Sequence, residues 1–418
     1  MKKYTAAAFC AAGMEKVVSN ELRKLSQISA DGGNEAYAIL KSGFGKVYFK
    51  TDLGGLYRAL LSLRTADRLM LETGGFPAPD FDALFEGTRN IPWEEYIPRG
   101  MGLTVSKVRS GSSRLKAETS IQAVVHKAAA DRLCKAYSLS RLPSPNKTAK
   151  LPGEVKQAEL RVHLEKDHVS VLLDISGEPL FKRGYRPAGG SAPLRESTAA
   201  AIILYSGWRR KFPLYDPLCG SGTIAIEAAL YAWDQAPGLG RHFALSSLSI
   251  ADKDTEETLR RELTEKIDYN RPLCISGSDA DETAVTLARA NFRRAMALPG
   301  LLNKNFSGHA ASGGTGVKIN CLPMDKAAPE KILLKKTEKV PEGFIITNPP
   351  YGKRLGDSAE AEERYRNMAL WGKTFPGWKL VLICNHSGFE SHFGRKADTC
   401  RELKSGAIDA WLYQYERL

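Results

Sequence analysis

From about residue 190 onward, short apolar runs alternate with amphipathic stretches, and this rhythm limits the possible folds more than any other feature. The apolar runs predict strands at 212–215, 273–277, 318–322, 344–347 and 379–384. The stretches between them predict helices, notably at 223–233 and 281–297. Strands that alternate with helices indicate a mostly parallel, doubly wound sheet. Two further strand-like runs, 399–404 and 410–415, lie only a short turn apart and predict a final antiparallel hairpin.

The first 190 residues have a different organisation. Up to about residue 70, the pattern predicts a small α+β unit with helices at 14–25 and 53–63 and a strand at 44–49. Farther on, loops that carry aromatic residues are expected around 76–96. The remaining elements predicted in this part are a strand at 101–108, a helix at 120–136, and strands at 159–164 and 168–174.

Charge is concentrated in one part of this first half. The 418-residue chain has a formal net charge of +13, and residues 99–166 hold 14 Lys and Arg against five Asp and Glu. A solvated basic face could account for such a stretch, but a polyanionic partner is the natural interpretation. The candidate phosphate contacts are Arg109, Arg114, Lys116 and Lys127.

Cysteine usage and hydropathy indicate the compartment. The seven cysteines are scattered and form no C-x-x-C pair, which fits a reducing cytosol and argues against disulfides or structural zinc. The scattered histidines show no metal-ligand spacing, so no metal is expected. No apolar run approaches the ~20 residues that span a bilayer. We therefore expect a cytoplasmic protein without a membrane partner.

A glycine-rich turn follows the first strand of the alternating region. The segment 215–223 contains Asp216, Pro217, Gly220, Gly222 and Thr223, and it ends a strand and opens a helix. Glycines there allow the backbone to approach a ligand at the helix N-terminus, where open α/β sheets bind cofactors. No Gly-Lys-Ser/Thr follows, and no third glycine completes a dinucleotide fingerprint. The turn therefore predicts a cofactor of another kind.

Two acidic residues follow the next two strands. Asp279 comes at the end of the strand predicted at 273–277 and could accept hydrogen bonds from ribose hydroxyls. Asp325 follows the strand at 318–322 and could accept from an adenine amine. Each acid alone is weak evidence, but a glycine turn and two acids on successive strands favour an adenosine-containing cofactor.

The most specific motif is Asn348-Pro349-Pro350-Tyr351. The prolines cannot donate to a sheet ladder, so the strand must stop at the asparagine. Its amide oxygen and a neighbouring carbonyl can accept both hydrogens of a planar amine, while the tyrosine offers a face on which an extruded base can stack. Accepting these hydrogens favours pyramidalisation of a weakly nucleophilic exocyclic amine, so positioning and electrostatics would carry most of the rate.

These motifs identify a resemblance. The chain resembles class I S-adenosylmethionine-dependent methyltransferases of the amino type, and along nearly its full length it is similar to bacterial RNA guanine-N2 methyltransferases with an N-terminal THUMP domain. Besides the motifs above, the resemblance rests on the segments 12–15, 91–93, 176–186, 192–196, 277–281 and 348–355. Met14 stands where the family often has leucine.

The resemblance implies an architecture. We expect a ferredoxin-like α+β unit over residues 1–68, a THUMP RNA-binding domain over 69–165, a connecting segment over 166–190 and a Rossmann-like methyltransferase domain over 191–418. The partner would be structured RNA, ribosomal or transfer; the resemblance does not indicate an oligomeric state.

The resemblance also implies roles for individual residues. Asp216, Gly220 and Gly222 would line the methionine end of S-adenosyl-L-methionine, Asp279 its ribose and Asp325 its adenine. The residues of the Asn-Pro-Pro-Tyr motif would hold the target base, and Asn348 would also face the cofactor. The segment 193–196, with Arg195 and Glu196, would close over the cofactor.

Three other functions remain open. The Asn-Pro-Pro-Tyr motif does not distinguish guanine N2 from adenine N6 in DNA or RNA. A protein glutamine methyltransferase could use the same chemistry on a side-chain amide, although the basic stretch argues against it. A non-catalytic RNA-binding or ribosome-assembly protein is the alternative of another class, and the intact Asp279, Asp325 and Asn348 argue against that.

Overall fold

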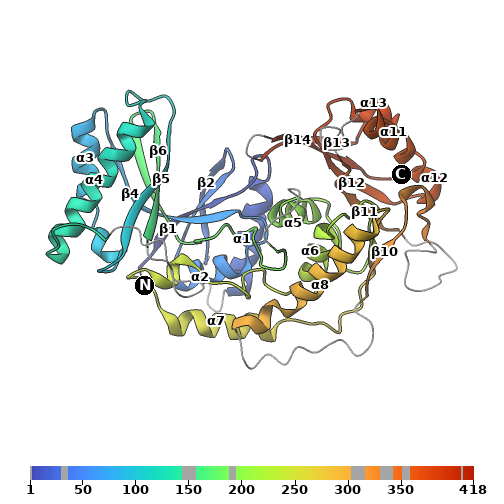
Figure 1. The fold of residues 1–418 in the computed structure, drawn as a ribbon, viewed down its shortest axis with the longest axis horizontal. Coiled ribbons are helices and arrows are strands. Elements are labelled where there is room, and N and C mark those ends of the chain that lie inside the picture. Colours follow the sequence, from blue (N-terminus) through green and yellow to red (C-terminus); the bar gives the residue numbers. More distant parts are fainter. Residues whose placement is uncertain are drawn as a thin grey trace.

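The computed structural model describes residues 2–29, 36–143, 157–187, 194–302, 316–329, 342–350, 358–405 and 408–418. Within these ranges the strands form two seven-stranded sheets, one in each half of the chain. Figure 1 shows the two sheets at opposite ends of an elongated molecule, with helices α5, α6 and α8 between them.

The first sheet has the strand order β2-β3-β1-β4-β7-β6-β5. Its strands are β1 Tyr4–Phe9, β2 Ala38–Gly43, β3 Lys46–Thr51, β4 Arg68–Pro77, β5 Gly102–Ser110, β6 Gln157–Glu165 and β7 His168–Asp174. The helices of this half are α1 Glu15–Ser29, α2 Leu53–Ser62, α3 Phe81–Arg89 and α4 Glu118–Tyr137. Alternate strand residues such as Ala6, Ala8 and Leu160 join the core that these helices cover. One face of the sheet is therefore packed against helices.

The aromatic segment before β5 differs from its prediction as a loop. Phe81 begins helix α3, whose N-terminus is capped by the Asp80 side chain accepting from the Ala83 N–H at 2.8 Å. Trp93 is fully buried in a short 3₁₀ turn. The prediction was wrong because tertiary burial of aromatic side chains, which local polarity does not reveal, decides this segment.

The sheet runs through the boundaries expected in this half. Strand β4 begins at residue 68 and pairs with both β1 and β7. Strand β7 lies inside the segment 166–190 that was expected to connect domains, and it also pairs with β6. The described strands thus form one continuous sheet, and the division into two N-terminal domains stays a prediction.

The second sheet confirms the predicted α/β fold. Its order is β10-β9-β8-β11-β12-β14-β13, parallel except for β14 and β13, which form an antiparallel hairpin. Its strands are β8 Leu214–Asp216, β9 Ile275–Asp279, β10 Val317–Cys321, β11 Phe344–Thr347, β12 Lys379–Cys384, β13 Thr399–Ser405 and β14 Ile408–Tyr415. Parallel strands buried on both faces explain the continuous apolar runs in the sequence.

Helices cover both faces of this sheet. They are α5 Glu196–Tyr205, α6 Thr223–Ala232, α8 Glu282–Leu302, α11 Ser358–Met368, α12 Trp371–Thr374 and α13 Phe389–Phe393. Val381 packs with α5 and α6 on one face, whereas its neighbours Leu380 and Leu382 pack with α11 and α13 on the other. The sheet is therefore the middle layer of three, which places its strand ends at an exposed edge.

Helix α7, Lys253–Glu265, joins the two halves. The structure packs its Leu259 and Leu263 into the core of the first half. A paired hydrogen bond between the Arg58 guanidinium of α2 and the Glu262 carboxylate, at 3.1 and 2.8 Å, adds a polar contact to this packing.

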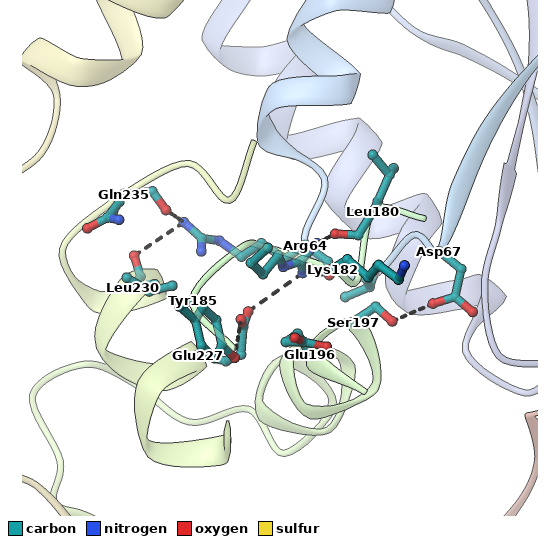
Figure 2. A network of polar contacts seen from close by, with 12 residues as sticks. Arg64, Asp67, Leu180, Lys182, Tyr185, Glu196, Ser197, Glu227, Leu230 and Gln235 are labelled. Atoms are coloured by element: carbon teal, nitrogen blue, oxygen red, sulfur yellow. Dashed lines mark hydrogen bonds and ion pairs between the residues drawn. The ribbon is translucent and has the colours of Figure 1, made fainter. Parts of the chain in front are cut away.

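A buried polar network forms a second junction between the halves (Figure 2). Arg64, which follows α2, donates to the backbone carbonyl of Gln235 at 2.8 Å. Arg183 donates to the carbonyl of Arg64 and lies 3.6 Å from the Glu227 carboxylate of α6, which also accepts from the Tyr185 hydroxyl at 3.1 Å. The first half is thus connected to the helix that follows the glycine-rich turn.

Candidate active site

The glycine-rich turn runs from the end of β8 to the start of α6. Gly220 and Gly222 adopt positive φ angles of 49° and 81°. A Cβ on Gly222 would lie 2.9 Å from the Cβ of Ala288 in α8, whereas a Cβ on Gly220 would meet nothing within 4 Å. Gly222 is therefore required by both conformation and packing, and Gly220 by conformation alone. Thr223 begins the helix, as the sequence predicted.

Asp279 holds this turn. Its Oδ2 accepts from the backbone N–H of Gly220 at 2.9 Å, and its Oδ1 accepts from the N–H of Asp281 at 3.1 Å. The Cys219 N–H donates to the carbonyl of Ser278, also at 2.9 Å. The glycine turn and the end of β9 thus lie against each other, as expected if both contact one ligand.

Asp216 at the end of β8 is buried, with an exposed fraction of 1%. Its Oδ1 accepts from the Thr347 hydroxyl at 2.7 Å and from the Leu218 N–H at 3.2 Å. Burial raises the pKa of this carboxyl to about 7, although the hydrogen bond from Thr347 opposes the shift. Asp216 is therefore a carboxyl that changes protonation near neutral pH, and Pro217 is the next residue in the turn.

The Asn-Pro-Pro segment leaves the centre of the sheet. Strand β11 lies between β8 and β12 and ends at Thr347, so Asn348 follows directly from the residue that contacts Asp216. Asn348 is half-buried and Pro349 is buried. The carbonyl of Pro350 accepts from the Tyr365 hydroxyl of α11 at 3.3 Å. Tyr351, the predicted stacking residue, lies outside the described residues.

Asp325 lies at the same edge of the sheet. It is exposed in a 3₁₀ turn, Met324–Lys326, which follows β10. The N–H of Leu322 donates to the carbonyl of Asp279 at 2.9 Å, so this turn begins beside the end of β9. The ends of β8, β9, β10 and β11 therefore bring Asp216, Asp279, Asp325 and Asn348 to one edge, as parallel strands must.

Arg195 and Glu196, at the start of α5, contact different parts of the molecule. Arg186 donates to the Glu196 carboxylate at 2.8 Å, and its Nη1 lies 3.5 Å from the Thr223 hydroxyl at the start of α6. Arg195 instead pairs at 2.9 Å with Asp67 of the first half. Glu196 thus lies beside the glycine turn through Arg186, whereas Arg195 contacts the junction between the halves.

Two contributors to this site were missed in the sequence. Thr347 connects Asp216 to the Asn-Pro-Pro segment, and a threonine ending an otherwise apolar strand was the available signal. Arg186 lies in the segment 176–186 of the resemblance but had no predicted role, although it connects Glu196 to Thr223.

The predicted phosphate contacts do not form one patch. Arg109 is an exposed residue of β5, whereas Lys127 is exposed on α4. Arg114 pairs with Asp167 at 3.3 Å, and Lys116 is exposed in the loop between β5 and α4. Their role in RNA binding stays a prediction.

A cluster not predicted from the sequence contains Glu362, His386 and His392. The Nε2 atoms of the two histidines lie 3.8 and 3.7 Å from Glu362 Oε1. The Gly388 N–H donates to His386 Nδ1 at 3.1 Å, and Arg366 Nη1, which can only donate, lies 3.4 Å from His392 Nδ1. In neutral rings each proton then lies on Nε2 and faces the carboxylate. At 3.8 and 3.7 Å these contacts are too long for hydrogen bonds, and an Nε2 that carries a proton has no lone pair to offer a metal.

Comparison with known protein families gives two matches. The model of the RMKL-like methyltransferase domain matches residues 183–300 and 324–414. The model of the RlmL ferredoxin-like domain matches residues 5–70.

Individual relatives cover nearly the whole chain. "Putative RNA methyltransferase YpsC" of Bacillus subtilis strain 168 is 34% identical over 415 residues, which are 99% of this chain and 96% of that protein. The structure of SMU.472, solved in complex with SAH, is 34% identical with a TM-score of 0.80, covering 99% of this chain and 98% of that one. A protein of Listeria monocytogenes, described as a predicted N6-adenine-specific DNA methylase, has 34% identity and a TM-score of 0.81, covering 99% and 96%. In the described part of this chain, no helix has the length and apolarity needed to cross a membrane.

Proposed function

The chain belongs to the RMKL-like methyltransferase family, and we propose on this basis that it methylates the exocyclic N2 amine of a guanine in structured RNA, ribosomal or transfer. The observation that carries the proposal is that Asp216, Asp279 and Asn348 lie at one edge of the second sheet. Two hydrogen bonds, Gly220 N–H to Asp279 and the Thr347 hydroxyl to Asp216, connect the strand ends there.

The described residues fit S-adenosyl-L-methionine as the cofactor. The glycine turn leaves backbone N–H groups near the start of α6, and Asp279 and Asp325 follow adjacent strands where hydroxyl and amine donors need acceptors. SMU.472, 34% identical, was solved with SAH. When bound, this cofactor supplies a methyl group on a positively charged sulfonium. Asp216, Asp279 and Asp325 would provide the acidic surroundings that a cationic sulfonium and its adenosine favour.

The Asn348 segment would act on the target amine. Its amide oxygen and the Pro349 carbonyl would accept the two amine hydrogens and direct the nitrogen lone pair toward the methyl group. Methyl transfer would form the N–C bond while the S–C bond breaks, with its electron pair staying on sulfur. The proton would then leave the cationic nitrogen for water, so no strong base would be needed before attack.

RNA as the substrate is supported by the basic stretch 99–166 and by the name of YpsC. The THUMP assignment of residues 69–165 and the other domain boundaries belong to the same proposal. Adenine N6 is the second candidate, supported by the description of the Listeria protein.

The test is direct labelling. The purified protein is incubated with tritiated S-adenosylmethionine and, separately, with ribosomal RNA, transfer RNA and DNA from a strain lacking its gene. Nucleoside analysis should give N2-methylguanosine from an RNA pool. Label in N6-methyladenine would change the proposed target base to adenine and leave amino methylation as the proposed reaction. Absence of label from every pool, with the cofactor still bound, would favour the protein-substrate or non-catalytic alternatives.

A further inference from the structure

The first sheet has a second face that no described helix covers. Residues that alternate with the core positions point to this side, and at its centre they form a small apolar cluster of Ala7, Phe9, Tyr48, Met70 and Leu172. Helices α1 to α4 pack against the opposite face (Figure 1). This second face is built from β1, β3, β4 and β7 at its centre, where Ala7, Met70 and Leu172 are fully buried, with β5 and β6 on one side and β2 on the other.

Cations surround this apolar centre. We define the basic face as Lys41 of β2, Lys46 of β3, Lys107 and Arg109 of β5, and Arg161 of β6. Although three strands, β1, β4 and β7, separate β3 from β6 in the sheet order, Lys46 Nζ lies 2.8 Å from His163 Nδ1 of β6. The sheet is therefore curled, and the curl brings positive groups from both of its edges together.

These charges are only partly compensated. Within the described ranges, Lys107 and Arg109 form no ion pair, and the Nε of Arg161 is buried without a hydrogen-bond partner. The carboxylates nearby are Glu159, 3.4 Å from Arg161, Glu165, and Asp174, which pairs with Arg68 of β4 and also acts on Arg161. Glu72 lies near Tyr48 and Glu118 near Lys107.

The ionisation of the basic face reflects this shortage of negative charge. Burial, followed by the charges of Arg109 and Lys41, lowers the pKa of Lys46, and Glu165 offsets this only in part. Burial and the nearby cations, Lys46 first, lower the pKa of His163 to about 3. Burial, the largest cause of both shifts, disfavours any charge at these two groups, and only the smaller contribution of the neighbouring cations favours an added anion.

Aromatic rings are interleaved with the cations. Lys46 Nζ and the Arg161 guanidinium lie 5.8 and 5.9 Å from the ring centre of Phe9, and Lys41 Nζ lies 4.5 Å from that of Tyr48. These contacts hold the long cationic side chains over the sheet, so less conformational entropy is lost when they meet a ligand.

We propose that the basic face is the docking surface for the phosphate backbone of the RNA substrate, an inference that rests on the proposed function. Spaced cations on a curled sheet match a polyanion with regularly spaced charges. The face also borders the catalytic half. The Phe9 carbonyl accepts from the Asp67 N–H, and Asp67 contacts Arg195 and Ser197 at the start of α5. An RNA on this face would therefore extend toward the candidate active site.

The experiment compares two double charge reversals of equal size. Lys107→Glu with Arg109→Glu changes two exposed residues of the basic face, and Lys24→Glu with Lys135→Glu changes two exposed residues on α1 and α4, over the opposite face. Binding of ribosomal and transfer RNA is measured by fluorescence anisotropy across a salt series. The first variant should bind at least about tenfold more weakly at low salt, and its salt slope should fall by about 2. The second should bind like the unchanged protein.

Two controls separate binding from folding. Thermal melting and S-adenosylhomocysteine binding should be unchanged in both variants, and Lys107→Gln with Arg109→Gln should give an intermediate loss of RNA affinity. Equal loss in both charge-reversal variants, or a larger loss from Lys127→Glu on α4, would overturn the inference while leaving the proposed function intact. If the unchanged protein bound and methylated no RNA, both would fail.

Discussion

One hydroxyl joins the two chemical motifs at the residue scale. The Thr347 side chain donates to Asp216 at 2.7 Å, and the next residue is Asn348. The position of the Asn348 amide is therefore fixed by a buried contact of the preceding residue to the end of β8 and by the ladder of β11. Because this contact is internal, removing the amide itself should alter chemistry without moving the strand ends.

Substitution of Asn348 tests this separation. Asn348→Ala should lower kcat by roughly 10²-fold or more, because the target amine loses an acceptor that positions it for attack. Affinity for S-adenosylhomocysteine, measured by calorimetry, should stay within a few-fold. Thr347→Val, with the buried hydroxyl removed, serves as the comparison, since it should affect stability as well. Unchanged turnover in Asn348→Ala would remove this residue from the mechanism.

The carboxyl of Asp216 should make stability depend on pH. Its folded pKa of about 7 lies above the ordinary value of 3.8, so the folded state binds a proton that the unfolded state has lost between these values. Without cofactor, the free energy of unfolding should therefore fall as pH rises from about 4 to about 7, by roughly 2–4 kcal/mol from this group.

Asp216→Asn provides the control, because its amide oxygen can still accept from Thr347 and Leu218. Urea unfolding at pH 5 and pH 8 should show a smaller pH-dependent loss in this variant than in the unchanged protein. An identical pH dependence in the two proteins would mean that Asp216 ionises normally when folded.

At the scale of elements, the glycine turn shows how two similar residues differ in constraint. Gly222 has both a positive φ and Ala288 at contact distance, whereas Gly220 has only the positive φ. The first constraint comes from the turn itself, and the second from helix α8, which lies more than 60 residues farther along the chain.

The pair of alanine variants measures these constraints. Gly222→Ala should lower the free energy of unfolding by about 2–4 kcal/mol, from backbone strain together with overpacking. Gly220→Ala should cost about 1–2 kcal/mol, from conformation alone. Urea denaturation compares them, and equal losses would show that α8 moves aside without cost.

The elements that the sequence predicted well are those with a strong local pattern. Strands β11 and β12 have their predicted bounds, and β7 matches at 168–174, because continuous apolar runs end at turn residues there. Helix α3 was missed, since its exposed Phe81 and its internal Gly87 are not typical of a helix, and its packing against α4 and β4 could not be inferred from the local sequence. In the candidate site, the positions of Asp216, Asp279 and Asp325 at one sheet edge could be predicted because each lies at or shortly after the end of a predicted parallel strand. The Thr347–Asp216 bond could not, because it depends on the pairing of β8 with β11.

At the scale of the whole molecule, the two halves share cores. Met14, which precedes α1, and Val17 of α1 pack with the second sheet, while Leu259 and Leu263 of α7 pack with the first. The charged network of Figure 2 lies where the halves meet, with Arg183 and Glu227 both almost fully buried. The orientation of the basic face relative to the candidate active site therefore depends on contacts that also stabilise the fold.

Neutralising one member of this buried pair should be costly. Glu227→Gln keeps an oxygen for the Tyr185 hydroxyl but leaves the Arg183 charge uncompensated, so the free energy of unfolding should fall by about 3 kcal/mol. Adding Arg183→Met removes the second charge and should recover part of this loss, although hydrogen bonds to the Leu180 and Arg64 carbonyls disappear. Denaturant unfolding of the single and the double variant tests this, and a double variant less stable than Glu227→Gln alone would contradict it.

The position of α7 has a consequence for synthesis of the protein on the ribosome. The core beneath the first sheet stays incomplete until Leu263, which comes after the glycine turn in the chain, has left the exit tunnel. We therefore expect apolar side chains of α2 to stay partly exposed on the nascent chain until α7 has been made. Folding of the N-terminal half during translation should be complete only after residue 263 has emerged.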